Sequence, residues 1–129
     1  MNFTGISGLP GINPGASDAE LNALQAALGV TLPATYRELM RYSNGALLDS
    51  GVSIYSVDDA AERNTTYEVL EYCPGFLLIG DDSGGRGFLI DTKDEAGRIY
   101  GSGLGDLDPS EFVTIASTLQ DWMDKGLGV

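Results

Sequence analysis

Apolar residues recur at helical spacing early in the chain. Leu21, Leu24 and Leu28 lie three and four positions apart, as on one face of a helix. The tetrapeptide Ser17-Asp18-Ala19-Glu20 before them has the order of a capping box, in which a hydroxyl and a carboxylate satisfy free backbone amides. Gly29 can adopt the left-handed conformation at low steric cost. The pattern therefore predicts a helix that begins at the serine and ends at this glycine.

A second helix is predicted from Pro33 onward, because a first helical turn tolerates the missing amide hydrogen of proline. The apolar spacing continues on one side of this segment, with Tyr36, Leu39, Met40 and Ser43. Asn44-Gly45 then forms a strong stop signal.

The middle of the chain changes to short apolar runs. Val52, Ile54 and Tyr55 suggest a short strand. The run Ser56-Val57-Asp58-Asp59 looks like a helix cap, and the polar helical segment after it continues, with interruption, to Tyr72.

Three further strands are predicted after Pro74-Gly75. The run from Phe76 to Ile79 is continuously apolar, which suits a central strand covered on both faces. Residues 88–90 and 99–100 give two more strands, with residues 92–97 as the hairpin loop between them.

A last helix is predicted at Asp108-Pro109-Ser110-Glu111, which places a cap, a proline and a reciprocal acid in order. Its apolar stripe would contain Phe112, Ile115, Ala116, Leu119 and Met123, and Lys125 and Gly126 would end it. We therefore expect an α+β fold with N-terminal helices, a small antiparallel β-sheet meander and a C-terminal packing helix. A single domain over residues 17–129 would follow an extended, Gly/Pro-rich arm over residues 1–16.

Charge changes the choice of partner. The 129 residues carry a formal net charge of -12, a balance that repels nucleic acid and anionic membranes and raises the encounter rate with basic proteins. Solubility alone would explain the same charge.

The cellular compartment is predicted from the cysteine content and the N-terminal sequence. Cys73 is the sole cysteine, and the segment Met1 to Ile6 has neither the basic nor the apolar run of a signal peptide. The sequence thus predicts a cytoplasmic protein.

Catalytic motifs are weak. Asp82-Ser83-Gly84-Gly85 resembles the nucleophile loop of serine proteases, but the chain has no histidine to accept the serine proton. One cysteine without histidine disfavours zinc, and a calcium loop at Asp91 to Gly97 would place a lysine at a ligand position. Adjacent acids at Asp58-Asp59 and Asp81-Asp82 are more often solvated than catalytic. We predict no catalytic residue, no metal and no cofactor; a carboxylate-dependent hydrolase is the less favoured alternative.

Two glycine-anchored signals carry a family resemblance. The first combines Leu32-Pro33, Tyr36 three residues on, and Asn44-Gly45 at the helix end. The second is the turn from Gly80 to Gly87, rich in glycine and aspartate, between two apolar strands. Together they resemble the Smi/Knr-like branch of the SUKH superfamily, over about residues 17–123. The resemblance implies a bacterial immunity protein that binds and neutralises a cognate polymorphic toxin, or else a regulatory or scaffolding adaptor.

The partner-binding residues are predicted from acids that cluster at strand ends, where loops are held by a rigid scaffold. We expect docking on a basic toxin domain through Tyr55, Asp58, Asp59, Glu62, Asp81, Asp82 and Arg86. Trp122 is either an interface anchor or semi-buried packing, and the second interpretation fits its apolar helix better.

Overall fold

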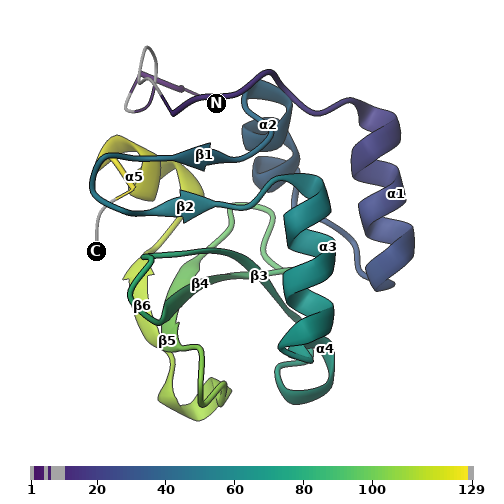
Figure 1. Ribbon diagram of the computed structural model, residues 1–129, viewed down its shortest axis with the longest axis vertical. Coiled ribbons are helices and arrows are strands. Elements are labelled where there is room, and N and C mark those ends of the chain that lie inside the picture. Colours follow the sequence, from purple (N-terminus) through teal and green to yellow (C-terminus); the bar gives the residue numbers. More distant parts are fainter. Residues whose placement is uncertain (1, 5, 7–10, 128–129) are drawn as a thin grey trace.

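Helices at both ends of the chain enclose a meander of strands in the computed structural model, which describes residues 2–4, 6 and 11–127 (Figure 1). The helices are α1 (Asp18–Leu28), α2 (Ala34–Tyr42), α3 (Val57–Thr66), α4 (Val69–Tyr72) and α5 (Leu119–Asp124). The strands are β1 (Ala46–Leu47), β2 (Ser53–Ile54), β3 (Phe76–Asp81), β4 (Arg86–Asp91), β5 (Ile99–Gly103) and β6 (Val113–Ala116). The predicted α+β class is confirmed.

The six strands form one sheet in the order β1-β2-β3-β4-β5-β6, and each neighbouring pair is antiparallel. Helices α3 and α4 pack on β3, α1 packs on α3, and α5 packs on β6 and α2 (Figure 1). The predicted central strand is buried on both faces, since Leu77, Leu78 and Ile79 are all fully buried.

The first helix forms as its sequence predicts. The Ser17 side chain accepts from the backbone of Glu20, and the Glu20 carboxylate accepts from the backbone of Ser17. Gly29 adopts the left-handed conformation at φ 66°, and the three predicted leucines are buried. In the second helix Pro33 lies at the N-cap, one position earlier than predicted.

The predicted helix start at Asp108 is wrong. Pro109–Glu111 forms only a single 3-10 turn, and the chain then continues as β6, which pairs with β5. The run Val113-Thr114-Ile115 is β-branched and favours a strand, so pairing with β5 outweighs the local helix signal. The C-terminal helix α5 begins only at Leu119, after a Thr118 cap that accepts from the Asp121 amide.

Part of the predicted N-terminal arm, including Gly5, Gly8 and Pro10, lies outside the described residues. The described remainder contacts the domain. Ile6 and Ala16 are buried, and Ile12 forms a β-bridge with Ala46. The interpretation of residues 1–16 as a separate arm therefore remains a prediction.

Trp122 is fully buried, with its ring centroid 4.9 Å from that of Phe88. It is therefore a core residue and more buried than predicted. Within the described part of the chain, no helix combines the length and apolar character needed to cross a bilayer.

Glu68 has a left-handed backbone conformation, at φ 52° and ψ 41°, which is strained for residues other than glycine. Its side-chain hydrogen bond with Glu71 raises the pKa of the Glu68 carboxyl. We expect Glu68→Gly to raise Tm by about 2–4 °C, because relief of the backbone strain exceeds the added freedom of the unfolded chain. Thermal unfolding monitored by circular dichroism measures this shift.

Glu68→Gln is the matched control, since it removes the carboxylate and keeps the strained backbone. A smaller rise in Tm is expected for the glutamine variant. An equal rise in both variants would assign the effect to the two carboxyl groups and contradict the backbone explanation.

Candidate protein-binding face

The acidic residues of α3 project from a firmly capped helix. Ser56 caps α3 by accepting a hydrogen bond from the Asp59 amide at 3.2 Å. Asp58, Asp59 and Glu62 are exposed, as a partner-binding role requires. The negative charges of Asp58 and Asp59 in the first turn also interact favourably with the helix dipole. The same two residues therefore give this surface its charge and help to stabilise α3.

Tyr55 connects α3 to the β3–β4 hairpin. Its ring is only 4% exposed, and its hydroxyl donates to Asp81 Oδ2 at 2.6 Å. Burial, followed by the hydrogen bond to Asp81, raises the pKa of the Tyr55 phenol, which stays a neutral donor. The Arg63 guanidinium lies 5.9 Å from the centre of the ring. Tyr55 therefore positions Asp81 and offers little surface of its own.

The hairpin tip is fixed by its own carboxylates. Asp82 Oδ1 accepts from the amides of Gly84 and Arg86, at 2.7 and 3.1 Å, and these bonds lower the pKa of the Asp82 carboxyl. The Ser83 hydroxyl donates to the Gly51 carbonyl at 2.6 Å, which ties the tip to the turn between β1 and β2. The glycine-rich turn thus presents Asp82 on an ordered loop.

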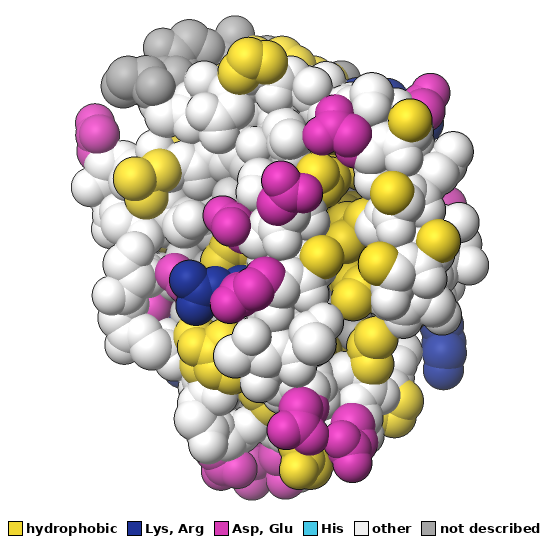
Figure 2. Space-filling view, turned by 45° about the vertical axis from the view of Figure 1, so that its right-hand side comes forward, with side chains coloured by type: hydrophobic (Ala, Val, Ile, Leu, Met, Phe, Trp, Pro, Cys, Tyr) yellow, Lys and Arg dark blue, Asp and Glu magenta, His cyan; other side chains and the backbone are white. Residues whose placement is uncertain are grey.

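Arg86 extends over the neighbouring strand. A β carbon placed on Gly101 of β5 would lie 2.8 Å from the Arg86 guanidinium, so the side chain lies across this glycine. The structure therefore divides the predicted residues into three places: exposed acids on α3, the pair of buried Tyr55 and half-buried Asp81, and the hairpin tip with Asp82 and Arg86. We call the surface formed by the exposed Asp58, Asp59 and Glu62 and the half-buried Asp81 and Asp82 the acidic face. Acidic side chains gather on the side of the molecule seen in Figure 2.

Two asparagines hold α3 in place: Asn44, which the sequence analysis interpreted only as part of a helix stop, and Asn64, which it did not single out. Asn44 Oδ1 accepts from the Val57 amide at 2.9 Å and so fixes the start of the helix. Asn64 is 1% exposed, and its amide bonds Ala60 and both backbone groups of Leu78. The helical spacing of Val57, Ala60 and Asn64, three and then four residues apart, could have placed Asn64 on the buried side.

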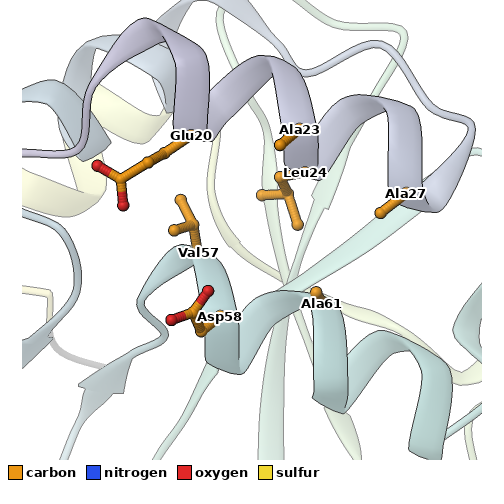
Figure 3. Close-up of a pocket in the computed structure, with 7 residues that line it drawn as sticks. All are labelled: Glu20, Ala23, Leu24, Ala27, Val57, Asp58 and Ala61. Carbon is orange, nitrogen blue, oxygen red and sulfur yellow. The ribbon is translucent and has the colours of Figure 1, made fainter.

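A shallow groove of about 260 Å³ runs between α1 and α3 beside the acidic face (Figure 3). Helix α1 contributes Glu20, Ala23, Leu24 and Ala27, and α3 contributes Val57, Asp58 and Ala61. A strip of apolar side chains with acids near its ends is visible on this side of the molecule (Figure 2). Only Asp58 of this set was predicted as a binding residue.

Catalytic chemistry has little support in this geometry. The Ser83 hydroxyl is engaged with a backbone carbonyl. The lowered pKa of Asp82 is the opposite of what a general acid near neutral pH requires. Among the described residues, no three His, Cys, Asp or Glu side chains come together in a way that could hold a metal ion.

Comparison with known proteins extends these observations. The model of the SMI1 / KNR4 family (SUKH-1) matches residues 15–125, a range that contains the five α-helices and six strands found in the described residues. The chain is also 33% identical over 111 residues to a Bacillus subtilis (strain 168) protein named "Uncharacterized protein YnaB". That match covers 84% of this chain and 74% of the Bacillus protein.

Proposed function

This chain belongs to the SMI1/KNR4 family (SUKH-1), and on that basis we propose that it is a non-enzymatic protein-binding module, an immunity protein that neutralises a cognate toxin in the cytoplasm. The match over residues 15–125 carries the proposal, because it includes both signals that pointed to SUKH immunity proteins.

The proposed mechanism is to cover the toxin without breaking a bond. The formal net charge of -12 attracts a basic toxin domain, and the acidic face gives that attraction a defined place. Capping at Ser56 fixes the start of the helix that bears Asp58 and Asp59, and bonds to the hairpin backbone hold the Asp82 carboxylate. Little conformational freedom is then lost on docking, which favours tight binding.

The partner can be identified by co-purification. Tagged protein is recovered from its native host across a salt series, and the retained proteins are identified by mass spectrometry. We expect a basic partner that is released as salt rises and that arrests growth when it is expressed alone. A partner without toxicity would contradict the immunity role and favour a regulatory or scaffolding adaptor.

The acidic face is tested with the recovered partner. We expect the triple variant Asp58→Asn/Asp59→Asn/Glu62→Gln to slow association about tenfold at low salt, with a smaller change in dissociation, because exposed charges act mainly on encounter. Surface plasmon resonance at several salt concentrations measures both rates.

The matched control is Asp106→Asn/Glu111→Gln/Asp124→Asn, which removes the same three charges from exposed positions outside the acidic face. Its association rate should fall much less. Equal effects of the two triple variants would show that net charge acts without a defined face, and no effect of either would contradict electrostatic attraction altogether.

A further inference from the structure

The groove between α1 and α3 exists because small side chains face one another across it. Ala23 and Ala27 on α1 lie opposite Ala61 on α3, so the two helices leave a gap that larger residues would fill (Figure 3). Leu24 and Val57 are buried and form its floor. The result is an apolar channel that remains open to the surface.

Its size favours a side chain over a free metabolite. Cavities that enclose small-molecule ligands typically measure about 300–1,000 Å³ and cover most of the ligand. This groove, at about 260 Å³, is smaller, and exposed residues such as Ala23 and Ala27 form its edge. An occupant must therefore be held by a larger body outside the groove, as a side chain on a docked protein is.

Charge at one end specifies the occupant. Glu20 and Asp58 lie in the first turns of α1 and α3, and both line the groove (Figure 3). Within the described part of the chain, neither forms an ion pair, whereas Asp18 pairs with Arg41 and Glu62 with Arg63. Every other lining residue is apolar. The groove thus combines an apolar channel with two carboxylates that lack a cation.

We propose that this groove receives a long basic side chain, arginine or lysine, from the protein partner. The methylene stem lies along the alanines, and the charged head bonds Glu20 and Asp58. Such a site matches both parts of these side chains, since their stems are apolar and their heads are cationic. The inference rests on the proposed function only in that a protein partner supplies the side chain.

Fragments of the side chain test the site without any partner. Butylguanidinium and butylammonium are titrated into the full ¹⁵N-labelled protein, followed by backbone amide NMR shifts. Guanidinium supplies the charge without a stem, and butanol the stem without a charge. We expect saturable shifts at α1 and α3 amides around the groove, with a dissociation constant on the order of 10 mM for at least one cationic fragment. The better fragment identifies arginine or lysine as the preferred residue.

Two variants make the assignment specific. Glu20→Gln/Asp58→Asn removes both charges, and glutamine at position 20 can still serve the capping box. Ala27→Leu fills the channel at an exposed helical position. Each should weaken fragment binding at least fivefold, whereas Asp106→Asn/Glu111→Gln, with the same change in charge, should leave it unaltered.

The inference is overturned if neither cationic fragment produces localised shifts. It is also overturned if guanidinium and butanol bind the groove as tightly as the two butyl cations do. It is also overturned if the groove variants bind as the unmodified protein does. None of these results would affect the proposed immunity role, which the growth and co-purification experiments test separately.

Discussion

Asn64→Asp is expected to destabilise the fold by about 3–5 kcal/mol at neutral pH, which would make Asn64 one of the most sensitive positions in the chain. The Asn64 side chain is 1% exposed, and its Nδ2 donates to the carbonyl oxygens of Ala60 and Leu78, each at 2.8 Å. Aspartate has nearly the same shape but cannot donate when ionised. Its carboxylate would face two carbonyl oxygens in a buried site.

The position of Asn64 explains why so much depends on one amide. Strand β2 pairs with Gly80 and Asp81 of β3, and the Tyr55 amide that follows β2 donates to the Ile79 carbonyl at 2.9 Å. The chain then enters α3 at Val57, one residue pair short of Leu78. The Asn64 side chain takes that place, since its Oδ1 also accepts from the Leu78 amide at 2.9 Å. Loss of the side chain would leave buried backbone groups unpaired and would loosen α3, which carries much of the acidic face.

The variant should also respond to pH in a defined direction. A buried carboxylate has a folded-state pKa above its unfolded value of about 3.9, so the folded variant binds the proton more tightly. The deficit relative to the unmodified protein is therefore largest above the folded-state pKa and shrinks as pH falls towards 5. Urea unfolding at pH 7 and pH 5, monitored by the buried Trp122, measures both deficits.

Asn22→Asp provides the control, because Asn22 is exposed on α1 and bonds to the Arg37 guanidinium. The same chemical change there should alter stability by less than about 0.5 kcal/mol. If Asn64→Asp were as mild as this control, or lost stability as pH fell from 7 to 5 relative to the unmodified protein, the proposed bridging role would be incorrect.

Local signals with few structural alternatives were predictable from the sequence. The capping box at Ser17 and the left-handed Gly29 bound α1 as expected, and the apolar run from Phe76 forms the buried strand. These signals act through neighbouring residues, so no knowledge of the fold is needed to interpret them. The exposed acids of α3 followed in the same way from the cap at Ser56.

Features decided by distant partners were not predictable. Asp108 followed by Pro109 suits a 3-10 turn as well as a helix, and pairing of Val113 with Gly101 of β5 settles the strand that follows. The buried Tyr55 likewise has its hydroxyl bonded to the carboxylate of Asp81, which comes from another strand. The α1–α3 groove brings residues together that no local pattern connects. Partner binding by the predicted residues stays a prediction.

Gly45→Ala is expected to cost about 3–4 kcal/mol, because this glycine has both an unusual conformation and a tight environment. Its φ is 81°, and an added β carbon would lie 2.7 Å from the Ser56 amide nitrogen and 2.8 Å from the Ile54 carbonyl oxygen. Both neighbours are backbone atoms, so neither can move without displacing β2 or the start of α3. The ending of α2 by Asn44-Gly45 is therefore only part of its role.

Gly29→Ala separates the two causes of that cost. Gly29 has a similar φ of 66°, but an added β carbon would meet nothing within 4 Å. Its variant should lose only about 1 kcal/mol, the cost of the left-handed conformation. Urea unfolding gives both values, and hydrogen exchange at the Val57 amide, which Asn44 holds at 2.9 Å, reports on the start of α3. Equal losses of stability in the two variants, with unchanged hydrogen exchange at the Val57 amide, would mean that Asn44-Gly45 serves only to end α2. A larger loss of stability in the Gly45 variant, with faster exchange at this amide, would show that the same dipeptide joins α2 to the helix bearing the acidic face.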